Sequence, residues 1–503
     1  MRRSPVDFRM HRFLLIVVAA LMSTAGCAVE SSALIPQPSL VQIASPEDQW
    51  FTVLLDGRKI GSFESSRKVR GAAVVTMQKL DMTLDRAGSR VALRSAETST
   101  ETIDGKPLAF RSVSLLSGSE TTIDGRVHHG SVQISVRNGG ATRHRRMDWP
   151  NGALLPEGVR LAGLRAGLDP GTRYRALSFQ PSSLDTAEVT SVVQAAETVD
   201  LPGGSMRLHP VEQTLVFSGA PVHSHLWVDT QQTVYKLTLP VMGVELTMLA
   251  CDRVCATAPN QASDVFERTL MHSPRPLTRS ELAGGLQYTL APRDGGASLR
   301  LPATDEQRVD AQGTERIVTI RPIATVGGEA GPTPDDYLSN DWLQSTAPEV
   351  RRLAQRAIGD AAKPRERMQR IETFVRGYIR KKTLDVGYAS ALEVARNPEG
   401  DCTEHAVLVA ALGRAVGIAT QIVDGLAYAP GFAGQDQVFV PHAWAQAWID
   451  GRWQSFDAAL AGFDAGHIAL AIGDGDPWRF YAGLDMLGRI DLRKVEPVAE
   501  AVR

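Results

Sequence analysis

The sequence predicts a multidomain protein, in which an N-terminal, mainly antiparallel β region is followed by a C-terminal α+β domain. Three observations support this prediction. The chain has 503 residues, a length typical of about three domains. Between residues 48 and 262, apolar or alternating segments are separated by Asp-Gly pairs, which favour the tight turns of hairpins. After residue 335 the apolar period changes from two to about 3.6, which indicates helices.

The composition is that of an ordinary globular protein. Hydrophobic residues make up 43% of the chain and charged residues 22%, and the formal net charge is −2. This balance argues against a strongly charged partner such as nucleic acid. A chain of this length can bury a large core, so stability requires neither a metal nor a disulfide.

The first 27 residues have the pattern of a targeting segment, which does not belong to the mature fold. Arg2, Arg3 and Arg12 precede the apolar run FLLIVVAALM, which is too short to span a bilayer comfortably. The following STAGC resembles a bacterial lipoprotein signal, and this resemblance implies that Cys27 is lipidated and becomes the mature N-terminus. Thr24 departs from that pattern, which usually has leucine there. An ordinary secretory signal is the alternative.

The lipoprotein signal implies that the protein is anchored in the bacterial cell envelope by its lipid and faces the periplasm. Ala28 follows the cysteine, which resembles sorting to the outer rather than the inner membrane. Residues 28–47 are expected to be a tether between the lipid and the first domain. No other run in the sequence has the length and apolar character of a transmembrane helix.

The domain boundaries follow from the change in pattern along the chain. Residues 48–262 are predicted to form the main β domain, with hairpin turns at three Asp-Gly pairs: Asp56-Gly57, Asp104-Gly105 and Asp124-Gly125. Residues 263–335 are expected to form a smaller β domain, with strands such as ERIVTIRPI, and a linker, GGEAGPTPDD. Residues 336–503 are expected to form the C-terminal domain.

Export also determines how the cysteines are interpreted. Cys251 and Cys255, in CDRVC, would lie in an oxidising compartment, where a local disulfide is the simplest arrangement. No second pair of metal-type ligands is nearby, and the HSH sequence at residues 223–225 lacks a third ligand. We therefore expect no metal and no cofactor. Cys402 is then the odd cysteine, which requires an explanation in an exported protein.

Cys402 lies at the start of an expected helix. The sequence GDCTEHAVLVAALGRAVGI places Asp401 as a reasonable N-cap, and Gly417 can end the helix. Unpaired backbone N–H groups and the helix dipole would stabilise a thiolate in the first turn. Glu404 is expected to complement the dipole. The alternative is a buried structural cysteine.

The sequence PHAWAQAWIDGRWQSFDAA, residues 441–459, predicts a hairpin with its turn at Asp450-Gly451. Because Ile449 then faces Arg452, continuing the register places Asp457 opposite Trp444, two residues from His442. His442 and Asp457 become diagonal neighbours, roughly 7 Å apart at the backbone, within side-chain reach.

These residues form a candidate catalytic triad. Cys402 would attack a carbonyl carbon, His442 would accept and deliver the proton, and Asp457 would orient the imidazole. His405 is a competing base on the same helix as Cys402, without an obvious carboxylate to orient it. A polar surface pair is the simpler interpretation of His442 and Asp457 when they are considered alone.

Other residues near the hairpin have more ordinary interpretations. Trp444, Trp448 and Trp453 are expected on the face of His442, where cross-strand packing is favoured over an acyl-binding groove. Residues 429–437, APGFAGQDQ, are expected to be a loop, either a movable lid or an ordinary surface loop.

Both motifs together resemble the core of the transglutaminase-like superfamily, a papain-related α+β fold. Their order and separation also match, and the resemblance covers roughly residues 336–470. It implies that Cys402 is the nucleophile, His442 the base and Asp457 its partner. It implies nothing about the β region.

The leading hypothesis is an envelope cysteine enzyme that transfers acyl groups at amide bonds of proteins or peptides through a thioester. Hydrolysis, as in a peptidase or amidase, is favoured over transamidation, and peptidoglycan stem peptides are among the admissible substrates. The alternative is a non-catalytic envelope scaffold or binding protein that uses the same fold. The candidate triad favours the enzyme, because binding alone requires no such constellation.

Overall fold

The computed structural model describes most of the chain from residue 48 onward. The described ranges are 48–86, 89–116, 119–138, 140–217, 220–241, 244–261, 269–293, 299–322, 326–382, 389–475 and 486–498. The predicted signal, Cys27 and the predicted tether lie outside them. The chain divides into two compact units, each described here by itself. Among the described residues, those up to 261 belong to the N-terminal unit, except 85–86, 89–91 and 119, which belong with residues 269–498 to the C-terminal unit.

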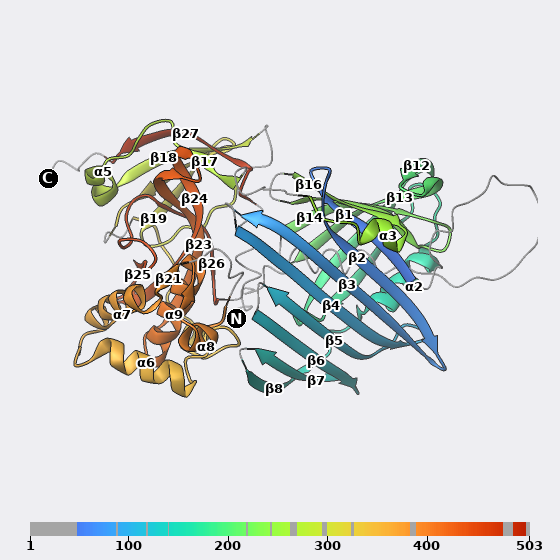
Figure 1. The fold of residues 1–503 in the computed structure, drawn as a ribbon, viewed down its shortest axis with the longest axis horizontal. Coiled ribbons are helices and arrows are strands. Elements are labelled where there is room, and N and C mark those ends of the chain that lie inside the picture. The colour runs from blue at the N-terminus through green and yellow to red at the C-terminus, as the bar shows by residue number, and fades with distance from the viewer. Residues whose placement is uncertain are drawn as a thin grey trace, which may run out of the picture. The chain divides into compact units, whose positions relative to one another are not determined.

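The N-terminal unit is built on one 16-stranded sheet (Figure 1). Its path runs β8-β7-β6-β5-β4-β3-β2-β1-β16-β15-β14-β13-β11-β10-β9, with β12 paired to β13. The strands are β1 (Asp48–Leu55), β2 (Arg58–Arg70), β3 (Ala73–Arg86), β4 (Ser89–Thr102), β5 (Pro107–Leu116), β6 (Ser119–His128), β7 (Ser131–Asn138), β8 (Ala141–Asp148), β9 (Ala153–Leu154), β10 (Arg173–Gln180), β11 (Asp185–Val193), β12 (Glu197–Leu201), β13 (Gly204–Phe217), β14 (Ala220–Val228), β15 (Val234–Val241) and β16 (Val244–Cys251). Most strands follow their neighbours directly and pair antiparallel, so the predicted antiparallel β region is confirmed.

Two of the three predicted Asp-Gly turns connect strands. Asp56 and Gly57 have φ of 50° and 75° and join β1 to β2, the left-handed geometry that suits a two-residue hairpin turn. Asp104-Gly105 lies between β4 and β5. The Asp124-Gly125 prediction was wrong, because both residues lie inside β6.

Gly125 has a packing role rather than a turn role. It pairs with Ile134 of β7, and a Cβ atom there would lie 2.1 Å from Cζ of Phe110. Phe110 and Ile134 belong to the buried cluster on this face of the sheet. Glycine is therefore needed here so that the aromatic ring can lie against the backbone.

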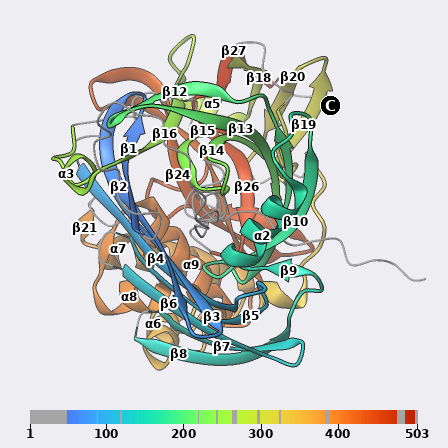
Figure 2. The same ribbon diagram turned by 90° about the vertical axis from the view of Figure 1, so that its right-hand side faces the viewer.

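Helix α2 (Pro156–Ala166) lies beside β9 and β10 (Figure 2). Its start is held by Glu101, whose carboxylate accepts hydrogen bonds from the N–H groups of Glu157 and Gly158 at 2.8 and 2.9 Å. Burial raises the pKa of Glu101 to about 7. Glu157 in turn forms ion pairs with Arg67 and Arg160.

The local disulfide anticipated in CDRVC is present. Cys251 ends β16 and Cys255 lies in the short helix α3 (Arg253–Ala256), with their Cα atoms 6.0 Å apart. Asp252 caps α3 by accepting a hydrogen bond from the N–H of Cys255 at 2.7 Å.

The C-terminal unit contains two larger sheets and a group of helices. The five-stranded sheet has the order β17-β24-β23-β26, with β25 paired to β24, and the four-stranded sheet has the order β19-β20-β18-β27. The strands are β17 (Met271–His272), β18 (Leu286–Pro292), β19 (Gln307–Gln312), β20 (Glu315–Ile320), β21 (Lys381–Lys382), β22 (Glu399–Gly400), β23 (Thr420–Phe432), β24 (Gln435–Ile449), β25 (Arg452–Phe456), β26 (His467–Gly473) and β27 (Ile490–Pro497). The helices are α5 (Arg279–Gly284), the 3₁₀ turn η2 (Pro334–Asp336), α6 (Pro348–Ile358), α7 (Pro364–Tyr378), α8 (Ala391–Arg396) and α9 (Cys402–Ala415).

The segment 263–335 was expected to be a separate smaller β domain, but its described residues, from 269 onward, belong to this same compact unit. Strand β18 pairs with β27, so the four-stranded sheet is completed by the C-terminal end of the chain. Tyr288 of β18, Phe439 of β24 and Val495 of β27 are buried in one hydrophobic cluster. This shared core explains why the segment does not form a domain of its own.

The apolar period of about 3.6 after residue 335 corresponds to helices such as α6 and α7. Their buried residues include Val350, Leu353, Met368, Ile371 and Val375. Helix α9 is buried almost throughout and packs against β24, β23 and α7 (Figure 1). In the part of the chain described above, every helix is too short or too polar to cross a membrane.

Candidate active site

Cys402 begins α9, directly after its N-cap. The Asp401 carboxylate accepts hydrogen bonds from the N–H and the hydroxyl of Thr403 at 2.9 and 2.8 Å. Glu404 closes the capping box by accepting from the N–H of Asp401 at 2.8 Å. Cys402 carries a thiol rather than a disulfide and is half-buried. A thiol in this position benefits from the positive end of the helix.

Glu404 lies in the first turn of α9, as the sequence placed it. Its side chain is fully buried, and burial raises its pKa to about 8, with the Asp401 charge adding to the effect. Its role is to accept hydrogen bonds from the N–H groups of Ala389 and Asp401, both at 2.8 Å.

The hairpin that carries His442 has the predicted register. Asp450 and Gly451 have φ of 54° and 79° and join β24 to β25. Ile449 pairs with Arg452, and the pairing continues to Ala445 with Phe456. The next residue, Asp457, leaves β25 beside His442.

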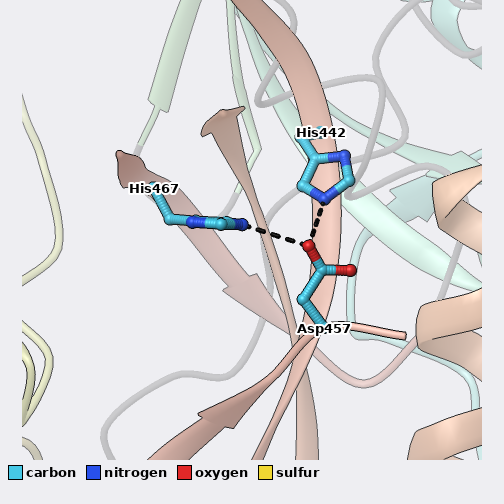
Figure 3. A group of neighbouring side chains, drawn as sticks. All are labelled: His442, Asp457 and His467. Carbon is cyan, nitrogen blue, oxygen red and sulfur yellow. Dashed lines mark hydrogen bonds and ion pairs between the residues drawn. The ribbon is translucent and has the colours of Figure 1, made fainter. Parts of the chain in front are cut away.

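The structure brings His442 and Asp457 into direct contact. Nε2 of His442 lies 2.9 Å from Oδ2 of Asp457, and both side chains are buried (Figure 3). The second imidazole nitrogen, Nδ1, is directed away from the carboxylate (Figure 3). An Nε2–H that donates to Asp457 leaves Nδ1 as the nitrogen that can exchange a proton with a nucleophile.

The Asp457 carboxylate is fully hydrogen bonded. Its Oδ1 accepts from the N–H groups of Ala459 and Leu460 at 2.8 and 3.2 Å. Burial alone would raise the pKa of Asp457, but the charges and hydrogen bonds of His442 and His467 outweigh burial and hold it well below its usual range. Asp457 is therefore a carboxylate throughout the physiological pH range.

Helix α7 holds the backbone of Asp457 in place. The Glu372 carboxylate accepts from the N–H of Asp457 at 3.0 Å, and Arg376 donates to the Asp457 carbonyl at 3.0 Å. Glu372 and Arg376 are one helical turn apart and also form an ion pair at 3.5 Å. The orienting carboxylate is thus fixed by both its side chain and its main chain.

His467 is a residue of this site that the sequence analysis missed. It begins β26, and its Nε2 lies 3.1 Å from the same Oδ2 of Asp457 that contacts His442 (Figure 3). Its Nδ1 lies 3.0 Å from Oδ1 of Asp464. Strand β26 pairs with β23, and nothing in the local sequence indicates that pairing. The His442, Asp457 and His467 ligand atoms lie within 4.8 Å of one another, so the group is also compatible with a metal ion.

The tryptophans near the site form packing contacts. Trp444 stacks beside His442 with ring centroids 6.3 Å apart and donates a hydrogen bond to the Ser455 hydroxyl. Trp448 and Trp453 form an edge-on pair with centroids 5.6 Å apart. These contacts agree with the cross-strand packing that the sequence favoured.

The structure also places the competing base, His405, and residues 429–437, which were expected to form a loop. Nδ1 of His405 lies 2.5 Å from the Asp401 carbonyl oxygen, so this buried imidazole is directed back along its own helix. The expected loop at residues 429–437 was wrong, because β23 and β24 extend through it to a two-residue turn at Ala433-Gly434.

The histidines of the HSH sequence do not gather around a common point. His223 is hydrogen bonded to the Thr214 hydroxyl at 3.1 Å, and His225 stacks on Trp227 with centroids 6.2 Å apart. In the described part of the chain, the ligand atoms that do converge belong to His442, Asp457 and His467.

Comparison with known proteins identifies the C-terminal region. Residues 351–458 match the family model of the transglutaminase-like superfamily. No curated protein matches the chain. The chain therefore contains a transglutaminase-like domain, within which Cys402, His442 and Asp457 all lie.

Three solved structures match parts of this chain at low identity. A provisionally assigned cysteine protease from Cytophaga hutchinsonii is 15% identical, with 43% of this chain and 84% of that chain covered and a TM-score of 0.27. A β-barrel-like protein of a domain of unknown function from Brucella abortus is 13% identical, covering 41% of this chain and 95% of its own, with a TM-score of 0.33. A provisionally assigned protease from Parabacteroides distasonis is 11% identical, with 71% of this chain and 69% of that chain covered and a TM-score of 0.20.

Proposed function

We propose that the protein is a cysteine enzyme that cleaves amide bonds of proteins or peptides through a thioester. The observation that carries the proposal is the buried hydrogen bond of 2.9 Å between His442 Nε2 and Asp457 Oδ2. It orients an imidazole on β24, the strand against which α9 packs, and α9 begins with Cys402. The match of residues 351–458 to the transglutaminase-like superfamily supports the same assignment.

The proposed reaction has two steps. Cys402 gives its proton to His442 and Sγ attacks the carbonyl carbon of the amide. The C–N bond breaks as His442 returns the proton to the leaving amine, and the acyl group remains on Sγ as a thioester. Water then attacks the thioester carbon while His442 takes its proton. The C–S bond breaks and His442 passes the proton to Sγ, which releases the carboxylic acid and restores the thiol. Asp457 stabilises the charged imidazole in both steps.

We favour water over an amine as the second nucleophile. Water is abundant and requires no dedicated binding site, whereas transamidation requires a second substrate to reach the thioester first. A peptide substrate supplied together with a competing amine tests this choice by product mass. A free carboxylic acid is the expected product. If the acyl group were found only in an amide with the added amine, the preference for water would be overturned.

We further propose that the enzyme is exported, is anchored through a lipid on Cys27 and faces the periplasm. We favour the outer membrane over the inner membrane as the site of the anchor. Envelope proteins and peptidoglycan stem peptides would then be accessible substrates. The support is the sequence pattern that ends in STAGC. Mass spectrometry of the mature N-terminus tests it. A diacylglyceryl modification on Cys27 is expected, and an unmodified N-terminus elsewhere would reject the anchor.

The catalytic proposal is tested by covalent trapping. A soluble form without residues 1–27 is incubated with a library of peptides that carry a thiol-directed electrophile, and adducts are mapped by mass spectrometry. We expect adducts on Cys402 that disappear in Cys402→Ala and slow markedly in His442→Ala. An unreactive Cys402 in the folded protein would instead favour a scaffold or binding protein.

A further inference from the structure

A second imidazole, that of His467, contacts the Asp457 carboxylate that orients His442. His467 is 2% exposed, and its two ring nitrogens face two aspartates, Asp457 at 3.1 Å and Asp464 at 3.0 Å. His442 and His467 share one acceptor atom, Oδ2 of Asp457 (Figure 3). A carboxylate oxygen has room for two such donors, so neither contact excludes the other.

The shared acceptor has a geometric consequence. Because Oδ1 of Asp457 is engaged by two backbone N–H groups, rotation of the carboxylate would break contacts at both oxygens. The contact with His467 fixes the direction of Oδ2 through a second partner beside His442 (Figure 3). The oxygen that orients the base is thereby held in place whether or not His442 carries a second proton.

Asp464 holds His467 in turn. Its Oδ1 also accepts from the N–H of Gly466 at 2.8 Å, so the turn before β26 is built around this side chain. Phe463 and Trp444 lie beside the His467 ring, with centroids 5.0 and 5.2 Å away. Both nitrogens of His467 are engaged and the ring is enclosed, so it is not placed to act as a competing base.

The charges of the cluster are consistent with this role. Burial lowers the pKa of His467, but its hydrogen bonds and the charges of Asp457 and Asp464 outweigh burial and raise it to about 9. A positive His467 between two carboxylates leaves one net negative charge in the cluster. The cluster that faces His442 therefore still carries a negative charge.

We propose that His467 is a positioning residue of the active site, which holds Asp457 Oδ2 against His442 Nε2 and is itself held by Asp464. The proposal rests on the proposed function, because it concerns the same triad. His467 contacts neither the substrate nor the reacting atoms in this assignment. It acts through Asp457.

The test measures the alkylation rate of Cys402 against pH, by mass spectrometry of the soluble form, which requires no substrate. The variants are His467→Leu, which removes both donors, His467→Gln, which retains one amide donor, and Asp464→Asn. His272→Gln is the matched control, because His272 is an exposed histidine of the same unit. Circular dichroism establishes that each variant is folded.

We expect the wild-type profile to have its midpoint below the roughly 8.5 of an ordinary thiol. In His467→Leu the lost positive charge would by itself lower the midpoint, whereas lost positioning of Asp457 should raise it. We expect the positioning effect to be larger, with a rise of roughly one unit and partial recovery in His467→Gln, since a hydrogen bond to a charged group is lost and then partly restored. A midpoint that falls would assign His467 an effect of charge alone and overturn the positioning role. Asp464→Asn should shift the midpoint less in the same direction, and His272→Gln should not shift it. A role limited to stability would lower the melting temperature without moving the midpoint.

Other charged groups around the cluster are unchanged in these variants. They are His442 on β24, and Glu372 and Arg376 on α7, which contact the backbone of Asp457. A moved midpoint can therefore be assigned to the substituted side chain.

The outcomes separate the two proposals. A low midpoint in the wild type that stays unchanged in both His467→Leu and Asp464→Asn would overturn the role of His467 alone. A wild-type profile that follows an ordinary thiol would overturn the proposed function and this inference with it. Stoichiometric zinc or iron in the purified protein, lost in His467→Leu, would assign the cluster to a metal ion and also overturn the positioning role.

Discussion

Nε2 of His442 lies 2.9 Å from Oδ2 of Asp457, and both groups are buried on the hairpin against which α9 packs. The hydrogen bond fixes the tautomer of the imidazole, because the nitrogen that faces a carboxylate carries the proton. It also provides a negative partner for the imidazolium that forms when the thiol loses its proton.

The first prediction concerns this hydrogen bond. In Asp457→Asn the side chain retains its shape but loses its charge and one acceptor. We expect the alkylation rate of Cys402 at pH 6.5 to fall by about 10- to 100-fold, as expected for loss of a charge-assisted hydrogen bond. Asp436→Asn is the matched control. Asp436 lies on β24, as His442 does, but near the turn that joins β23 to β24. Equal rates in the wild type and Asp457→Asn would contradict the assigned role of Asp457.

The local geometry of this site could be predicted from the sequence, because it depends on short-range rules. A two-residue turn at Asp450-Gly451 fixes the register of β24 and β25, and the register brings His442 to Asp457. The capped start of α9 likewise follows from Asp401 and the residues after it.

The features that the sequence did not reveal depend on long-range pairing. His467 reaches Asp457 because β26 pairs with β23, and β27 joins β18 about two hundred positions earlier in the chain. Gly125 was misread because a glycine that accommodates the Phe110 ring has the same local sequence as a glycine in a turn. In each case the deciding contact is with a residue outside the local pattern.

The second prediction concerns the loss of stability as pH rises from about 5 to about 8. Burial raises the pKa of Glu329 to about 8, and the nearby charge of Asp305 adds to the effect. Above the unfolded value of about 4.3 the unfolded chain loses this proton while the folded protein keeps it, so stability falls as pH rises toward about 8. Burial also raises the pKa of Glu404 to about 8, which makes stability fall over the same pH range.

Glu329→Gln tests this pH dependence. The amide retains an oxygen that can accept from Gln446, which donates to Glu329 Oε1 at 2.8 Å, but it cannot ionise. We expect the melting temperature to fall less between pH 5 and 8 in the variant than in the wild type. Glu349→Gln, at a half-buried carboxylate whose pKa is lowered by a hydrogen bond from Arg396, serves as the control. Parallel curves for wild type and Glu329→Gln would show that Glu329 does not retain its proton on folding.

The third prediction tests the packing at Gly125. An alanine there would place its Cβ atom 2.1 Å from Cζ of Phe110, within a buried cluster. We expect Gly125→Ala to reduce the free energy of unfolding by about 1–3 kcal/mol, through overpacking. Gly130→Ala is the comparison, because Gly130 has a positive φ of 75° but open space around it. Its cost should be about 1 kcal/mol, from backbone strain alone.

Urea unfolding followed by circular dichroism measures both glycine variants. A Gly125→Ala variant as stable as the wild type would mean that the Phe110 ring can move aside without loss. A larger cost at Gly130 than at Gly125 would reverse the expected order and show that turn strain outweighs the aromatic packing.

The fourth prediction separates the three cysteines that follow Cys27. Cys251 and Cys255 are joined, whereas Cys402 carries a thiol. Without reductant, alkylation of the soluble form should modify Cys402 alone, and reduction with denaturation should expose all three. Replacing Cys251 and Cys255 together by serine should reduce the free energy of unfolding by about 2 kcal/mol, because the disulfide closes only a short loop. The alkylation profile of Cys402 should not change, since the disulfide belongs to the other compact unit. Labelling of Cys251 or Cys255 in the untreated protein would contradict this assignment.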